Sequence, residues 1–144
     1  MDHRFKQGHV AAIQPMLVIA GRVVTTTSGT VGSYDVRGGG CTVTKTATET
    51  GRYTITLTDA GDTALTDLCF LHASATIVAA DDAALTTTKG IHAVIRDIDI
   101  GEGADNGTVE IQFVETVTAN ADTDIEDAMS FTFMLVLGLK AGAT

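Results

Sequence analysis

The sequence predicts an all-β fold, an antiparallel β-sandwich or jelly roll of about eight strands with an extended N-terminal arm. Apolar and polar residues alternate in most segments, as in GRYTITLT at 51–58, where Tyr53, Ile55 and Leu57 are the apolar positions. Residues typical of turns separate these segments, and no segment has the pattern of a good amphipathic helix. With 144 residues, the chain is long enough for one domain with a hydrophobic core.

Two parts are expected, an arm at 1–15 that closes at Pro15 and a β-sandwich domain at 16–144. Clusters of Gly, Asp, Asn and Ser separate the apolar segments of the second part and mark its turns. The strands predicted from this pattern are 16–25, 31–36, 41–46, 52–58, 68–78, 91–100, 108–118 and 129–139.

The last strand carries the clearest alternation. One face of 129–139 is wholly apolar, while the other begins with Ser130 and Thr132 and turns apolar at Met134 and Val136. We therefore expect the second half of this strand to be buried on both faces. In 108–118 the alternation shifts after Val114, which predicts a β-bulge.

The segments between strands are expected to be short. The triple glycine at 38–40 precedes a strand and has no P-loop lysine, so it predicts a flexible hairpin turn rather than a phosphate site. The segments 81–89 and 122–128 can each hold one short helical turn.

Charge and aromatic content restrict the possible partners. The net charge is −9, and residues 1–58 carry six Lys or Arg against three acidic residues, whereas residues 59–144 carry three against fifteen. Such an acidic body argues against nucleic acid as a partner. The basic leading section fits either docking on an acidic partner or a scatter of surface charge. Aromatic residues make up only 5% of the chain and Trp is absent, so stacking platforms would have few rings.

Targeting features are weak. Gln14 and Pro15 interrupt the apolar run near the start, so we interpret that region as an arm followed by a strand rather than as a signal peptide. No run of about 18 apolar residues predicts a transmembrane helix. Cys41 and Cys69 are expected to be buried free thiols in a reducing cytoplasm, although their pairing stays open.

No catalytic motif is recognisable. His3 and His9 fall in the arm, while His72 and His92 fall within predicted strands, and no nucleophile elbow accompanies them. The chain is therefore predicted not to be an enzyme and to need no cofactor. A hydrolase that uses His72 or His92 is the least favoured class.

Calcium is the one metal that the sequence suggests. Asp97, Asp99, Glu102 and Asp105 surround a glycine-rich turn, and oxygen ligands on a bending loop suit Ca²⁺. The EF-hand pattern fails, because Gly101 occupies the third ligand position. A plain acidic hairpin turn is the favoured alternative.

A second acidic cluster allows the same two readings. It either binds Ca²⁺ or caps a short helical turn, since acidic side chains favour a helix N-terminus. Its residues are Asp122, Asp124, Glu126 and Asp127.

The segment CTVTKTATETGRYTITLTD at 41–59 resembles a hairpin found in small β-sandwich virion proteins of tailed bacteriophages. These include capsid decoration (cement) proteins and fibre domains. A first strand like MLVIAGRVV and a last strand like FTFMLVLGL extend the resemblance over about residues 16–140.

The resemblance implies a structural role rather than a chemical one. It implies a homotrimer that binds the major capsid protein, or another virion protein, on the outer capsid surface after synthesis in the host cytoplasm. A terminal arm often anchors such proteins, which makes Arg4, Phe5 and Lys6 the candidate docking residues. The alternative is a fibre or receptor-binding domain for host-surface glycan, against which the scarcity of aromatic residues counts, since Tyr34 and Tyr53 are the only tyrosines.

Overall fold

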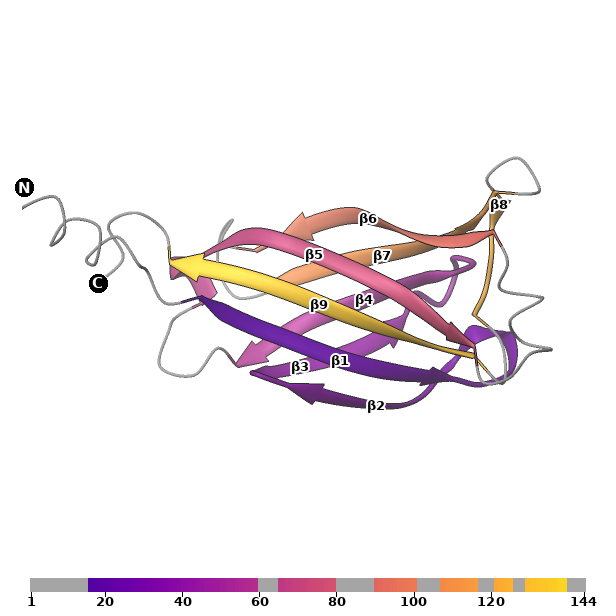
Figure 1. Cartoon of the computed structure of the whole chain (residues 1–144), viewed down its shortest axis with the longest axis horizontal. Helices are drawn as coiled ribbons and strands as arrows, with labels where there is room; N and C mark the ends of the chain where they lie inside the picture. Colours follow the sequence, from indigo (N-terminus) through magenta and orange to yellow (C-terminus); the bar gives the residue numbers. More distant parts are fainter. Residues whose placement is uncertain are drawn as a thin grey trace, which may run out of the picture.

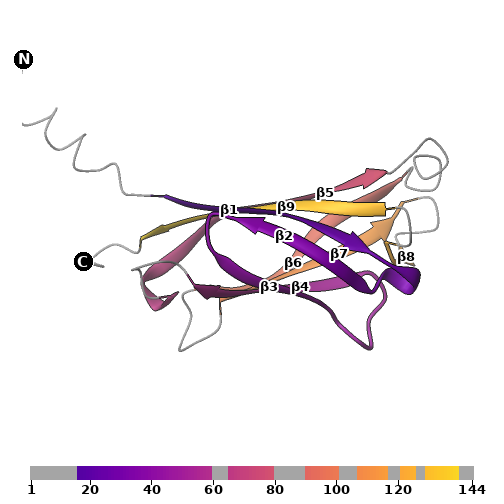
Figure 2. The same cartoon turned by 90° about the horizontal axis from the view of Figure 1, so that it is seen from below.

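The computed structural model describes residues 16–59, 65–79, 90–100, 107–116, 121–125 and 129–139. They form two antiparallel sheets whose strands run along the long axis of the molecule (Figure 1). Seen from below, the sheets are two stacked layers (Figure 2). The predicted antiparallel β-sandwich is therefore confirmed. The arm, with Arg4, Phe5 and Lys6, lies outside the described residues.

One sheet has four strands and the other five. In spatial order the four-stranded sheet contains β2 (Val31–Arg37), β1 (Leu17–Thr25), β9 (Met129–Leu139) and β5 (Leu68–Ala79). The five-stranded sheet contains β3 (Gly40–Lys45), β4 (Arg52–Asp59), β7 (Thr108–Glu115) and β6 (Ile91–Asp99), with β8 (Ala121–Asp122) also paired to β7. Two short 3-10 turns, Thr27–Gly29 and Leu65–Asp67, precede β2 and β5.

Strand pairing confirms one expectation from the sequence and adds a neighbour relation that the sequence did not predict. The hairpin at 41–59 is formed by β3 and β4, whose pairing includes Cys41 with Leu57 and Lys45 with Tyr53. The first and last strands of the sandwich, β1 and β9, are neighbours throughout their lengths (Figure 1).

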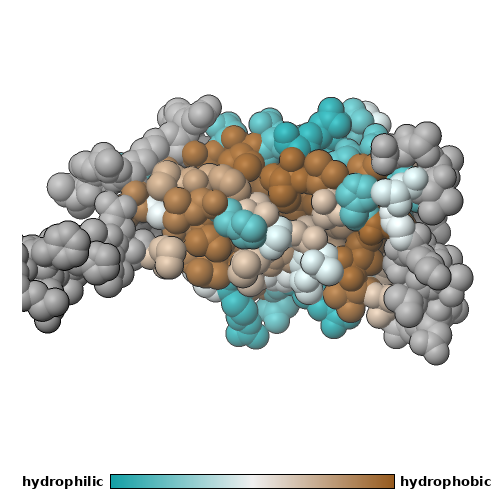
Figure 3. Space-filling model, turned by 45° about the horizontal axis from the view of Figure 1, so that its top comes forward, coloured by the Kyte–Doolittle hydropathy of each residue, from teal (hydrophilic) through white to brown (hydrophobic). Residues whose placement is uncertain are grey.

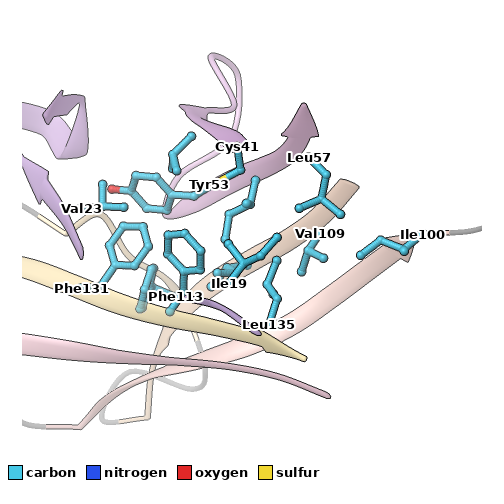
Figure 4. Close-up of a cluster of buried hydrophobic side chains, with 14 of the residues drawn as sticks. Ile19, Val23, Cys41, Tyr53, Leu57, Ile100, Val109, Phe113, Phe131 and Leu135 are labelled. Carbon is cyan, nitrogen blue, oxygen red and sulfur yellow. The ribbon is translucent and has the colours of Figure 1, made fainter. Parts of the chain in front are cut away.

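The core lies between the sheets and is built from the apolar phase of each strand. At its centre the rings of Tyr53, Phe113 and Phe131 pack against one another, with ring centroids 4.9–5.7 Å apart (Figure 4). All three side chains are fully buried. Ring pairs at such separations and tilts pack favourably, so this cluster fixes the distance between the layers.

Three local predictions are wrong. The glycines at 38–40 do not form a hairpin turn, because they connect β2 of one sheet to β3 of the other. Pairing in β7 is continuous, and the irregularity lies instead in β6, between Ile95 and Asp97. The outward side chains in the second half of β9 are not buried, since Met134 is 39% exposed and Val136 is partly exposed.

Residues 121–125 also differ from the expected helical turn. Ala121 and Asp122 pair with Glu115 and Val114 as β8, and residues 123–125 continue without helix. The other predicted helical turn, at 81–89, lies outside the described residues.

Candidate interaction surface

The four-stranded sheet has one face on the core and one face toward solvent. Residues of β1, β9 and β5 that alternate with the core positions form the second face, which we call the outer face. It comprises Val18, Ala20, Arg22, Val24, Leu71, His72, Ser74, Thr76, Val78, Ser130, Thr132, Met134 and Val136.

Strand register arranges these side chains in rows across the sheet. Val18, Val136 and His72 lie opposite one another in one row, and Ala20, Met134 and Ser74 form the next. Neighbouring side chains on one face of paired strands are in contact range. The apolar side chains of these two rows therefore adjoin one another, while the next row, Arg22, Thr132 and Thr76, is polar.

Large apolar side chains on the outer face are substantially exposed. The exposed fraction is 45% for Val18, 40% for Val24, 51% for Leu71 and 39% for Met134. Figure 3, an oblique view of this side of the molecule, shows hydrophobic surface with hydrophilic and intermediate side chains among it. Contiguous apolar patches of this kind mark interaction sites in soluble proteins.

A β-bulge in β5 shapes one end of the outer face. Pairing with β9 is irregular between Phe70 and His72, and Leu71 lies in the bulge. The Leu71 side chain packs over Gly138, where an added Cβ would lie 3.1 Å from its Cδ1 atom. A larger residue at 138 would push Leu71 outward, so the glycine keeps this end of the face level.

Acidic side chains are rare on the solvent side of the four-stranded sheet, where the one acid of its described strands is Asp35 of β2, opposite Arg22. β1, β5 and β9 contain no Asp or Glu, although the chain has 18 acidic residues. Their only cation is Arg22, whose Nε donates a hydrogen bond to the Ser130 Oγ at 3.2 Å. Depletion of charge at the centre of a patch is a feature of protein–protein interfaces.

The solvent side of the five-stranded sheet is polar by comparison. Threonines face one another across its strands, with Thr42 opposite Thr56 and Thr44 opposite Thr54. Carboxylates follow toward β6, where Asp97 pairs with Glu110. The two sheets therefore present different chemistry to solvent.

The calcium candidates receive no support from the described residues. Asp97 and Asp99 are exposed side chains of β6, on the same side of the strand as expected, and the Asp97 carboxylate accepts a hydrogen bond from the Ile98 N–H. Glu102 and Asp105 lie outside the described residues. Within the described part of the chain, no group of three His, Cys, Asp or Glu residues could hold a metal ion.

The histidines and cysteines do not converge on one site. His72 lies on the outer face and His92 on the solvent side of the five-stranded sheet. Both cysteines are free thiols; Cys41 is buried as predicted, whereas Cys69 is only partly buried. Burial raises the pKa of the Cys41 thiol, which keeps it protonated and unreactive.

Two residues of the second acidic cluster, Asp122 and Asp124, are among the described residues. Asp124 forms an ion pair with Lys45, with 2.7 Å between Oδ1 and Nζ, and accepts a hydrogen bond from the Gly51 N–H at 2.6 Å. Lys45 Nζ also donates to the Ser28 carbonyl. Asp124 thus connects the segment after β8 to the β3–β4 hairpin. It does not cap a helix, and it belongs to no metal-binding group among the described residues. Glu126 and Asp127 lie outside the described residues.

Tyr53 completes this polar cluster at the rim of the core. Its hydroxyl donates a hydrogen bond to the Gly29 carbonyl at 2.7 Å. Burial, and to a smaller extent the nearby Asp124 carboxylate, raises the pKa of Tyr53 well above its usual range. A backbone hydrogen bond with Ile125 has a smaller, opposite effect on this pKa. Since Tyr53 is fully buried, it cannot stack on a ligand, and Tyr34, 41% exposed, is the one tyrosine with an accessible ring.

Comparison of the chain with protein-family models, with curated proteins and with solved structures finds no match. Within the described residues, no helix has the length and hydropathy needed to cross a bilayer.

Because of its exposed apolar side chains, the outer face of the four-stranded sheet is the candidate functional site. Its apolar residues in β9 were recognisable in the sequence but were expected to be buried.

Proposed function

We propose that this protein is a non-enzymatic structural protein of a bacteriophage virion, a decoration (cement) protein that binds the outer capsid surface as a homotrimer and stabilises the shell. The observation that carries the proposal is the outer face, where Val18, Leu71 and Met134 leave apolar surface in contact with water. Exposed apolar surface of this kind is costly unless another protein covers it.

Two further features support an assembly role. The first is that the interior is fully packed and hydrogen-bonded. The rings of Tyr53, Phe113 and Phe131 are fully buried, and every buried side-chain nitrogen or oxygen of the described residues has a hydrogen-bond partner. The hairpin at 41–59 is the segment in which the sequence resembles small virion proteins, and it is formed by β3 and β4.

The charge distribution supports a place on the exterior of a shell. The acidic residues are concentrated after residue 58, whereas the leading section is basic. An acidic surface is repelled by packaged DNA and is compatible with the outer side of a capsid. A basic leading arm suits docking on an acidic lattice, with Arg4 and Lys6 as the charged contacts and Phe5 as the apolar one.

Capsid binding by the full-length protein tests the proposal. Purified protein is mixed with expanded capsids from the corresponding phage lacking this gene, and binding is measured by co-sedimentation, with the heat stability of the capsids as a second readout. We expect saturable binding and a raised capsid melting temperature. Substitution of Arg4, Phe5 and Lys6 by Ala should weaken binding at least about tenfold and leave the oligomer intact.

Absence of binding by the wild-type protein would contradict the proposal. A glycan array provides the competing outcome: selective binding of a host glycan without capsid binding would support the receptor-binding alternative. Calorimetry with CaCl₂ on the same protein shows whether that binding involves calcium.

A further inference from the structure

We propose that the outer face is the surface on which copies of this chain meet, so that β9 and its neighbours β1 and β5 lie against the threefold axis of the oligomer. This inference rests on the proposed function, because it assigns the contact surface of the proposed homotrimer. The partner to which it commits is a second copy of the same chain.

Charge is the first argument for an identical partner. Each copy carries a net charge of −9, so two copies repel each other unless they meet where acidic side chains are absent. β1, β5 and β9 have no Asp or Glu, whereas β6, β7 and β8 carry Asp97, Glu110 and Asp122. The outer face is therefore the broad surface on which copies of this chain approach with the least repulsion.

A different protein with a basic surface would be attracted elsewhere. Its cations would favour the carboxylates of the five-stranded sheet, where Asp97 lies opposite Glu110. On the outer face it would meet Arg22, polar and apolar side chains, and no carboxylate of β1, β5 or β9. Charge complementarity thus separates the surface for identical copies from the surface for a basic partner.

The edge strands give a second, independent argument. Three of the four edges carry features that discourage pairing with another chain: β2 has Asp35 and Arg37, β3 is only six residues long, and β6 has a bulge beside Asp97. β5 is also an edge strand and has 12 residues, yet its only ionisable side chains are His72 and Cys69. Beyond its own bulge at Leu71, the regular part of this edge, residues 72–79, has no Asp, Glu, Lys or Arg, and such an edge is a hazard unless a neighbouring subunit covers it.

The order of strands in the four-stranded sheet is the reason for placing β9 nearest the threefold axis of the proposed trimer. The charged pair Arg37–Asp35 lies on β2 at one edge of the four-stranded sheet, with 84% and 73% of the two side chains exposed. The charge-poor part is consequently β1, β9 and β5, with β9 in the middle. Met134, central in β9 and 39% exposed, would contact its counterparts in the other subunits.

The test compares charge insertions on the two sheets of the full-length protein. Met134→Glu and Leu71→Glu place a carboxylate on the outer face, while Val94→Glu places one on the five-stranded sheet at a side chain that is 42% exposed. All three positions are exposed in a single copy, so the variants should retain the β-sheet circular-dichroism spectrum. Mass is measured by light scattering during gel filtration from nanomolar to micromolar protomer.

We expect a trimeric wild-type protein and a trimeric Val94→Glu variant. Met134→Glu and Leu71→Glu should dissociate to folded monomers, with at least about a hundredfold higher midpoint concentration for assembly, because each subunit buries an unpaired charge. If one outer-face variant fails to fold, the other decides the result.

Three outcomes would overturn the inference. The first is a trimer that persists with both outer-face substitutions, and the second is dissociation by Val94→Glu alone. Neither result touches capsid binding by the wild-type protein, which tests the proposed function separately. A wild-type protein that stays monomeric at high micromolar concentration would overturn the inference as well.

Discussion

At the scale of single residues, Asp124 connects parts of the chain that the sequence does not associate. It bonds Lys45 and Gly51, which are more than 70 positions earlier in the chain. In the sequence, Asp124 stands out only as a member of an acidic cluster, because residue spacing does not indicate contacts between positions so far apart in the chain. The contact becomes evident only once the β3–β4 hairpin and the segment after β8 are placed side by side.

The ion pair leads to a prediction about stability. Asp124→Ala should lower the free energy of unfolding by about 2–3 kcal/mol, because the Lys45 ammonium loses its ion pair and the Gly51 N–H loses its acceptor. Lys45→Ala should cost less, about 1–2 kcal/mol, since Asp124 keeps the Gly51 hydrogen bond. Urea denaturation at one fixed protomer concentration measures both values.

Arg37→Ala is the matched control for these variants. It removes the Arg37–Asp35 pair, in which both side chains are largely exposed, and should leave stability unchanged. Equal losses for Asp124→Ala and Lys45→Ala would show that the Gly51 hydrogen bond contributes nothing.

At the scale of elements, the strands were predictable and several connections were not. The predicted bounds of 129–139 match β9, and those of 52–58 match β4 to within one residue, because alternation identifies strands directly. Alternation does not say to which sheet a strand belongs, so residues 38–40 were interpreted as a hairpin turn. The two-residue strand β8 is too short to show a pattern.

Gly38 shows what the crossing between the sheets requires. Its φ is +92°, and a Cβ at this position would lie 1.9 Å from the Val18 carbonyl oxygen. Both the left-handed backbone conformation and the close approach to β1 therefore demand glycine. The residue fixes where the chain leaves the four-stranded sheet.

Replacement of Gly38 should consequently be costly. Gly38→Ala is expected to lower the free energy of unfolding by more than about 2 kcal/mol, since the backbone of either β1 or the crossing must move. Gly32→Ala, near the start of β2, is the comparison, because the closest atom there is a Thr26 side-chain methyl group that can rotate away. Thermal unfolding distinguishes them, and similar melting temperatures would contradict the argument.

At the scale of the whole molecule, the core couples stability to alkaline pH through Tyr53. The pKa of Tyr53 is raised in the folded protein, whereas in the unfolded chain it is near its ordinary value of about 10. Above about pH 10 the unfolded state therefore holds fewer protons than the folded state, and stability falls as pH rises. Tyr53 contributes up to about 1.4 kcal/mol per pH unit to this slope.

Tyr53→Phe tests the coupling. The variant should be about 1–2 kcal/mol less stable at pH 7, because the Gly29 carbonyl loses its donor, and it should lose stability less steeply between pH 10 and 11. Urea denaturation at several pH values, with reductant present, gives both quantities. Parallel curves for the two proteins would show that the Tyr53 hydroxyl does not titrate differently on folding.

The candidate site illustrates the limit of sequence reasoning at this scale. The apolar character of Met134 and Val136 was evident in the sequence, but a single chain gives the same pattern for a strand buried in its own core and for one covered by another subunit. Which of these holds depends on what packs on that side of the sheet. In the structure no described element covers it.

The adjacency of β1 and β9 has a consequence for biosynthesis. These strands pair from Leu17 with Leu137 to Val24 with Ser130, so partners in the middle of the four-stranded sheet are more than 100 positions apart. While the ribosome is still making the first hundred residues, β1 can pair with β2 but not with β9, so the sheet cannot be completed until β9 is made. Folding of the sandwich is thereby completed only when its synthesis is nearly finished. Until then the edge of β1 that later pairs with β9 is accessible to chaperones.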